Sequence, residues 1–307
     1  MAKLRRKIHS FDIFSGHAWY VPGVGGIFSL LLLLLAGVAL GSLVTVIITF
    51  SLGAQAALEY GMLISYPLMF VPPMIYVGVK SRRNMLFEPG YALDSNHFGK
   101  SGGALLALLC AIAVLAAAFM TDFFNSLMPP MPDFLADALK SMTSGELWVD
   151  LLCVAVFAPV FEEWLCRGMV LRGLLNAKKE DGSRVSSPAW AIVISALFFA
   201  LIHANPWQAI PAFVLGCLFG YVYYRTGSLK LTMLMHCVNN AFAVICSRID
   251  AFSEMDNWVD IFPRTQYWIL FAACAMLLIL IVRVFDRIPL SSPSGNCDPV
   301  TEDTVTE

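Results

Sequence analysis

Residues 161–167 read Phe161-Glu162-Glu163-Trp164-Leu165-Cys166-Arg167, which places two adjacent carboxylates and a guanidinium inside an apolar region. Charged side chains at membrane depth are costly unless they are paired or solvated, and they usually have a function there. This stretch therefore indicates a helix inside a membrane and marks the place where chemistry is expected.

The composition of the chain is that of a membrane protein. Of its 307 residues, 58% are hydrophobic and 14% are charged, and the mean hydropathy is +0.72. Soluble globular domains carry roughly 25% charged residues. We therefore predict an all-α, polytopic membrane protein.

Eight apolar runs are long enough, or nearly long enough, to cross about 30 Å of hydrocarbon at about 1.5 Å per residue. They are Ile27–Phe50, Ala57–Val79, Gly103–Phe124, Leu147–Leu165, Pro188–Ile202, Pro206–Tyr224, Leu231–Ser247 and Tyr267–Phe285. We predict about eight transmembrane helices in a single domain, residues 1–288, with a motif-bearing core at residues 147–247 and an intramembrane catalytic cavity.

The basic residues predict the orientation of these helices. With both termini in the cytoplasm, the inside segments hold 16 lysines and arginines and the outside segments hold 3, when Arg167 is set aside with its motif. This bias follows the positive-inside rule and predicts a multi-pass protein of the cell membrane. Residues 289–307 are rich in Ser, Pro, Thr and acidic residues, and we expect them to form a disordered cytoplasmic tail.

The same composition argues against several other functions. The basic residues follow membrane topology and form no patch interleaved with aromatic residues, so nothing supports nucleic-acid binding. Seven of the eight cysteines fall in or beside apolar runs, and no Cys-x-x-Cys is present. Neither a zinc site nor a redox pair is therefore indicated, and we predict no cofactor.

Polar side chains recur in two later runs. His203 ends the stretch Phe199-Ala200-Leu201-Ile202-His203 and is followed closely by a proline, which forbids normal helix continuation. His236 and Asn240 are four residues apart, so the imidazole and the carboxamide project from one helix face.

Together these groups could hydrolyse an amide with an activated water. Glu163 and Arg167 can form an ion pair along one helix face, while Glu162 lies about 100° around the helix and addresses a different space. A carboxylate can take the proton from water, a histidine can hold that water, and two fixed donors can stabilise the oxyanion.

The ordered set Glu-Glu-x-x-x-Arg, Phe-x-x-x-His and His-x-x-x-Asn, spanning roughly residues 161–240, resembles the type II CAAX prenyl endopeptidases. Their prokaryotic relatives form the CAAX protease and bacteriocin-processing family. These proteins are intramembrane glutamic endopeptidases with an eight-helix core, and all three motifs match without a departure.

The resemblance implies a role for each motif residue. Glu162 would be the general base that acts on water, with His203 as its partner, and His236 and Asn240 would form the oxyanion hole. The remaining two, Glu163 and Arg167, would organise the site. The partners implied are a peptide or protein substrate, with or without a lipid group, and membrane lipid; the oligomeric state is not specified.

Two other functions stay open from the sequence. Two histidines and a carboxylate can hold catalytic zinc, so a zinc-dependent membrane protease is one alternative, although no His-Glu-x-x-His is present. A non-catalytic membrane immunity or scaffold protein that kept the motifs is the other. Asp150, three turns before Glu162, is interpreted as an interfacial carboxylate without a catalytic part.

The predicted topology contains one geometric conflict. Glu162 and His236 would lie in the inner half or the middle of the bilayer, whereas His203 would lie near the outer end of its helix. We therefore expect the fifth helix to be short, with Asn205 and Pro206 in a broken segment that lines the cavity.

Overall fold

The computed structural model describes residues 14–84, 93–94, 98–141, 145–179, 183–249 and 257–290 of the chain. Within these residues the regular structure is helical, apart from one isolated bridge between Lys178 and Arg184. Most of the predicted tail, residues 291–307, lies outside the described part, so its disorder stays a prediction.

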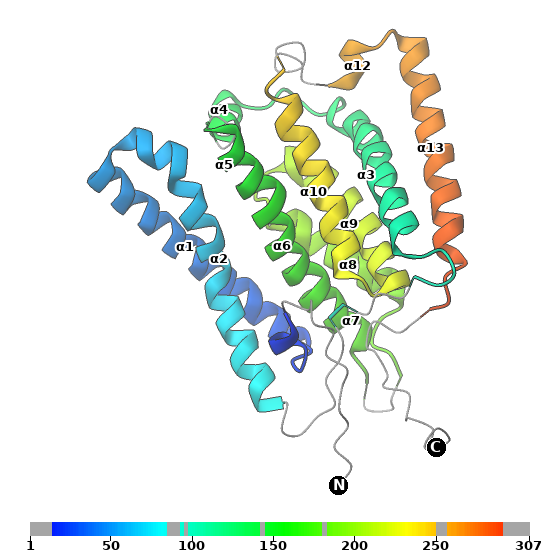
Figure 1. The fold of residues 1–307 in the computed structure, drawn as a ribbon, viewed down its shortest axis with the longest axis horizontal. Coiled ribbons are helices and arrows are strands. Elements are labelled where there is room, and N and C mark those ends of the chain that lie inside the picture. Colours follow the sequence, from blue (N-terminus) through cyan, green and yellow to red (C-terminus); the bar gives the residue numbers. More distant parts are fainter. Residues whose placement is uncertain are drawn as a thin grey trace.

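The helices follow one another along the chain as Figure 1 shows. Their bounds are η1 Ser15–His17, α1 Val24–Leu52, α2 Ala54–Asn84, α3 Gly103–Asn125, α4 Asp133–Ser141, α5 Leu147–Leu152, η2 Cys153–Phe157, α6 Ala158–Glu163, η3 Trp164–Leu171, α7 Arg172–Asn176, α8 Pro188–Leu201, α9 Pro206–Thr226, α10 Leu229–Cys246, α12 Trp258–Ile261 and α13 Arg264–Asp286. Of these, η1 is a 3₁₀ turn, and η2 and η3 are π-helical.

Each of the eight predicted apolar runs coincides with helix. In the described part, five helices are long and apolar enough to cross a membrane, namely α1, α2, α3, α10 and α13, and α8 is a shorter apolar helix. The fourth run is helical without interruption from residue 147 to residue 176, through α5, η2, α6, η3 and α7. The polytopic all-α fold is confirmed, and the count of eight spans stays a prediction.

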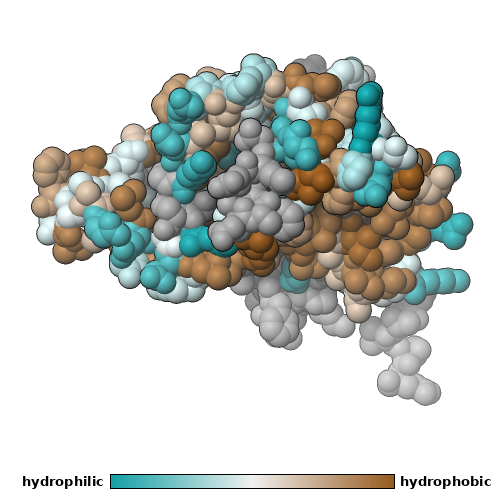
Figure 2. All heavy atoms as spheres, turned by 90° about the horizontal axis from the view of Figure 1, so that it is seen from above, coloured by the Kyte–Doolittle hydropathy of each residue, from teal (hydrophilic) through white to brown (hydrophobic). Residues whose placement is uncertain are grey.

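The outer surface of the bundle is apolar, as contact with lipid requires. Large apolar side chains are exposed along α1 and α13, including Phe28, Leu35, Ile269 and Ile279. Hydrophobic residues cover much of the flanks of the molecule in Figure 2. Soluble monomers rarely expose contiguous apolar area on this scale, so the surface agrees with a multi-pass membrane protein.

Helices α1 and α2 form a hairpin at the left of Figure 1. Two glycines of α1 allow the helices to approach closely. A Cβ atom at Gly37 would lie 1.9 Å from the Met69 carbonyl oxygen, and one at Gly41 would lie 2.9 Å from the Ser65 carbonyl oxygen. Small residues four apart at a helix crossing are a common packing device in membranes, where no hydrophobic effect drives helices together.

The segment before α1, residues 14–22, packs against the end of the motif-bearing helix. Arg172, which is fully buried, donates from Nη1 to the Ala18 carbonyl at 3.3 Å and from Nη2 to the Tyr20 carbonyl at 2.6 Å. The His17 ring lies 5.3 Å from the Trp164 ring. Burial and the positive charge of Arg172 lower the pKa of His17.

The close crossing of α1 and α2 predicts that Gly37→Ala destabilises the protein. The added methyl group overlaps the Met69 carbonyl, and overpacking of this kind typically costs about 1–3 kcal/mol. Thermal unfolding in detergent micelles measures the loss. Gly25→Ala is the matched control on the same helix, since a Cβ there meets nothing within 4 Å. Equal melting temperatures for the two variants would contradict the close crossing.

Candidate active site

The motif-bearing helix departs from α-helical geometry on both sides of the paired glutamates. A π-helical segment at Cys153–Phe157 precedes α6, and a second one, Trp164–Leu171, follows directly after Glu163. Such segments are rare and occur frequently at functional sites. They change the direction of the side chains relative to a regular α-helix, and Arg167 lies within the second one.

Glu163 and Arg167 form the predicted ion pair. Arg167 Nη1 donates to Glu163 Oε1 at 2.8 Å, and both side chains are fully buried. Arg167 Nη2 donates to the Gly216 carbonyl of α9 at 3.0 Å. The guanidinium also lies over the Phe199 ring, 4.5 Å from its centroid, and over the Phe219 ring, 5.2 Å away. One arginine therefore connects the motif helix to α8 and α9.

His236 brings α10 to the same carboxylate. Its Nδ1 atom lies 3.1 Å from Glu163 Oε1, and its Nε2 atom lies 3.9 Å from Glu162 Oε2. A carboxylate can only accept, so we assign the proton to Nδ1, which donates to Glu163. In the neutral ring, Nε2 then carries a lone pair that faces Glu162.

One carboxylate oxygen of Glu162 accepts a hydrogen bond, and the other has no hydrogen-bond partner among the described residues. Tyr66 of α2 donates from its hydroxyl to Glu162 Oε1. The other oxygen, Oε2, is buried and has no hydrogen-bond partner among the described residues. Glu162 Oε2 and His236 Nε2 lie 3.9 Å apart, so a carboxylate oxygen and an imidazole nitrogen face each other at a distance longer than a hydrogen bond.

The Phe199 ring lies between His203 and His236, the histidine of this cluster. Its Nδ1 atom lies 2.8 Å from the Phe199 carbonyl oxygen. The Phe199 ring contacts both imidazoles, with centroids 5.0 Å from the His203 ring and 5.5 Å from the His236 ring. Among the described residues, no hydrogen bond or ion pair joins His203 to Glu162, so their partnership stays a prediction.

The fifth helix is short, as predicted, and His203 lies in the loop that follows it, whereas the expectation that Asn205 and Pro206 line a catalytic cavity stays a prediction. Helix α8 has 14 residues and ends at Leu201, which at about 1.5 Å per residue is too short to cross the hydrocarbon. Ala204 adopts a left-handed backbone conformation with φ 57°. Asn205 then caps α9, because its side chain accepts from the backbone N–H of Gln208.

Asn240 lies on the same helix as His236, and its carboxamide is already engaged. Its Nδ2 atom donates to the Val154 carbonyl at 2.8 Å, and its Oδ1 atom accepts from Asn239 Nδ2 at 3.0 Å. A carboxamide has two N–H donors, so one donor remains for a further acceptor. The contact with Val154 also ties α10 to the first π-helical segment.

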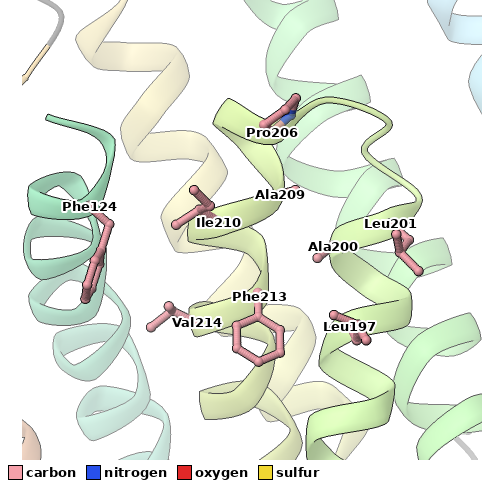
Figure 3. A pocket seen from close by; sticks show the side chains of 9 residues that line it. All are labelled: Phe124, Leu197, Ala200, Leu201, Pro206, Ala209, Ile210, Phe213 and Val214. Atoms are coloured by element: carbon pink, nitrogen blue, oxygen red, sulfur yellow. The ribbon is translucent and has the colours of Figure 1, made fainter. Parts of the chain in front are cut away.

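The structure outlines a groove of about 480 Å³ beside the His203 loop, drawn in Figure 3. Apolar side chains of α3, α8 and α9 line it, namely Phe124, Leu197, Ala200, Leu201, Pro206, Ala209, Ile210, Phe213 and Val214. None of the six predicted site residues lines this groove. A water-accessible cavity around Glu162 therefore stays a prediction.

Two further residues clarify which polar groups belong to the site. Asp150 is buried and pairs with Arg248, which also donates to the Gly145 carbonyl at 2.6 Å. This pair joins the start of the motif helix to the end of α10 and lies apart from Glu162.

Tyr66, in contrast, touches Glu162 directly, and nothing in its sequence spacing distinguishes it from other aromatic residues of its apolar run.

The zinc alternative would require three protein ligands that converge on one position. Within the described part of the chain, no group of three or more His, Cys, Asp or Glu side chains converges so that it could hold a metal ion. The cluster of Glu162, Glu163 and His236 is instead connected by hydrogen bonds to Tyr66 and Arg167. The arrangement suits acid–base chemistry by a carboxylate next to an imidazole.

The segment that carries the three motifs is similar to known proteins. Residues 144–242 match a family model described as type II CAAX prenyl endopeptidase Rce1-like. Over 93 residues the chain is 34% identical to the membrane-embedded CAAX protease MroQ of Staphylococcus aureus (strain USA300), an alignment that covers 30% of this chain and 36% of that protein. The chain thus spans little more than a third of the length of this curated relative. No solved structure matches the chain.

The buried pair predicts that Arg167→Ala lowers the stability of the protein. Removing one partner leaves Glu163 as an uncompensated buried charge, which typically costs about 3–5 kcal/mol. Thermal unfolding in detergent measures this cost. Arg264→Ala removes an exposed guanidinium and should leave the melting temperature nearly unchanged. If both variants melt alike, the pair is not a principal support of the fold.

Proposed function

We propose that this protein is an intramembrane glutamic endopeptidase, because its motif-bearing segment, residues 144–242, matches the family model described as type II CAAX prenyl endopeptidase Rce1-like. It hydrolyses a peptide bond with a water molecule that Glu162 activates. The observation that carries the proposal is the Oε2 atom of Glu162, which is buried, has no hydrogen-bond partner among the described residues and lies 3.9 Å from His236 Nε2.

The proposed general base is Glu162. One of its oxygens accepts from Tyr66, and the other, Oε2, lies 3.9 Å from His236 Nε2 and has no hydrogen-bond partner among the described residues. A water molecule bound to Oε2 can lose its proton to the carboxylate as it attacks the carbonyl carbon of the peptide. The same carboxyl group then delivers that proton to the leaving amine.

Glu163 and Arg167 act in this proposal by holding the site together. Arg167 neutralises Glu163, and Glu163 in turn fixes the orientation of the His236 ring. Since a donor that is already oriented costs no reorganisation during the reaction, this fixed ring is suited to a preorganised site.

His236 and Asn240 are the proposed oxyanion donors. Asn240 has one N–H free to donate, because the other is bound to Val154. His236 donates from Nε2 only when the ring carries both protons, since Nδ1 already donates to Glu163. A ring that carries both protons is a charged donor, and such a donor makes a stronger hydrogen bond to a developing negative charge than a neutral donor does.

His203 is proposed to hold the attacking water from the other side. Its Nδ1 atom is engaged by the Phe199 carbonyl, which directs Nε2 away from the backbone. Phe199 separates His203 from His236 and would form one wall of the space for the scissile bond. In this arrangement the substrate is a peptide or protein segment, with or without a lipid group, that enters from the membrane.

The proposed location is the cell membrane, with both termini in the cytoplasm. In Figure 1 the first described residues and the end of α13 lie on the same side of the bundle, which agrees with an even number of crossings. The excess of basic residues in the segments on that side supports a cytoplasmic orientation.

The mechanism predicts that Glu162→Gln abolishes peptide hydrolysis while the amount of protein in the membrane stays unchanged. The carboxamide keeps the shape of the side chain but cannot accept the proton from water. Mass spectrometry of membrane peptides from cells with the wild-type protein and with the variant identifies the lost products. Glu146→Gln is the matched control, because Glu146 is exposed and is the N-cap residue of α5, where the motif-bearing helix begins. Full turnover by purified Glu162→Gln protein would refute the base assignment.

A mechanism without metal predicts that chelators leave hydrolysis unchanged. Purified protein treated with 1,10-phenanthroline should cut the substrate found by mass spectrometry at the same rate as untreated protein. This measurement separates the glutamate mechanism from the zinc-dependent alternative. Loss of activity that added Zn²⁺ restores would favour the metalloprotease.

A further inference from the structure

We infer that Tyr66 of α2 is a positioning residue of the active site, which holds the Glu162 carboxylate with its reactive oxygen toward His236. This inference rests on the proposed function of Glu162 as the base. It assigns a role to a residue outside the segment 144–242 that matches the family, and it brings α2 into the catalytic machinery.

The contact between Tyr66 and Glu162 is direct and long-range. The Tyr66 hydroxyl donates to Glu162 Oε1, and the two residues are 96 positions apart in the chain. A phenol that donates to a carboxylate makes a charge-assisted hydrogen bond, which is shorter and stronger than one between neutral groups. The bond engages one oxygen only, so it leaves Oε2 as the single oxygen available for water.

Among the described residues, the Glu162 carboxylate accepts no second hydrogen bond of this kind. Among the described residues, Tyr66 is the hydrogen-bond partner of Glu162, and Oε2 has none. Without the phenol, rotation about the last side-chain bond of Glu162 would cost little, because that torsion is broad and roughly two-fold. The Tyr66 bond therefore selects one orientation of the carboxylate from several.

The position of Tyr66 is itself fixed by packing. Phe70, one turn further along α2, is almost fully buried and stacks on Phe161 with ring centroids 5.2 Å apart. The Tyr66 ring lies 5.8 Å from the Phe70 ring. Since Phe161 and Glu162 are adjacent, the stacked rings and the phenol contact hold one face of α2 against the motif helix at two neighbouring points.

The test is the kinetic effect of Tyr66→Phe on the purified full-length protein, with the peptide substrate that the Glu162 experiment identifies. Loss of one hydrogen bond to a charged group should lower kcat about 10-fold to 100-fold. We expect KM to change by less than about twofold, because the phenol contacts the base and leaves the substrate alone. Tyr60→Phe is the matched control, since Tyr60 lies on the same helix and is exposed.

Two measurements separate positioning from a merely structural role. The melting temperature of Tyr66→Phe in detergent should stay close to that of Tyr60→Phe, because the Phe70 stacking is retained. In a background of Glu162→Asp, whose shorter side chain moves the carboxylate away from Tyr66, the further substitution Tyr66→Phe should have a much smaller effect on kcat than it has alone.

The outcomes distinguish this inference from the proposed function. If Glu162→Gln is inactive while Tyr66→Phe keeps the kcat of Tyr60→Phe, the positioning role is wrong and the proposed function stands. If Tyr66→Phe raises KM or lowers the melting temperature without changing kcat, the residue serves binding or folding instead. If Glu162→Gln retains full activity, the proposed function itself fails, and the role of Tyr66 fails with it.

Discussion

The arrangement of polar groups in this membrane protein depends on the buried ion pair between Glu163 and Arg167. A charge inside the bundle is tolerable only when it is compensated, and here each charge is compensated by the other. The pair also contacts three other helices. Glu163 binds His236 of α10, and Arg167 binds the Gly216 carbonyl of α9 and lies over the Phe199 ring of α8. Helices α6, α8, α9 and α10 are therefore placed relative to one another by a single electrostatic requirement.

Much of this arrangement could be predicted from local sequence. The apolar runs predict helices, because the length and hydropathy of a run are enough to identify a membrane-spanning helix. The spacing of four residues places Glu163 beside Arg167 and His236 beside Asn240 on shared helix faces, although the first pair lies at the start of a π-helical segment. The short fifth helix could also be expected, because Pro206 limits its length. Each of these features depends on residues that are close together in the chain.

The rest depends on contacts between distant segments, which spacing alone does not encode. Tyr66 reaches Glu162 because α2 packs against the motif helix, and the ring of Phe199 lies between two histidines because α8 and α10 meet there. The pairing of Asp150 with Arg248 has the same origin. The two π-helical segments, Cys153–Phe157 and Trp164–Leu171, are also not indicated by the spacing of the motif residues. The number of crossings and the substrate are likewise not determined by these motifs.

The contact between Arg172 and the segment before α1 has a practical consequence for handling this protein. The guanidinium is fully buried, and two of its acceptors are the carbonyl oxygens of Ala18 and Tyr20. A shortened form that begins at α1 would lack these two acceptors, and the buried guanidinium at the end of the motif-bearing helix would lose its hydrogen bonds to them. Affinity tags for purification are better placed at the opposite terminus, which leaves the contacts of Arg172 with Ala18 and Tyr20 intact.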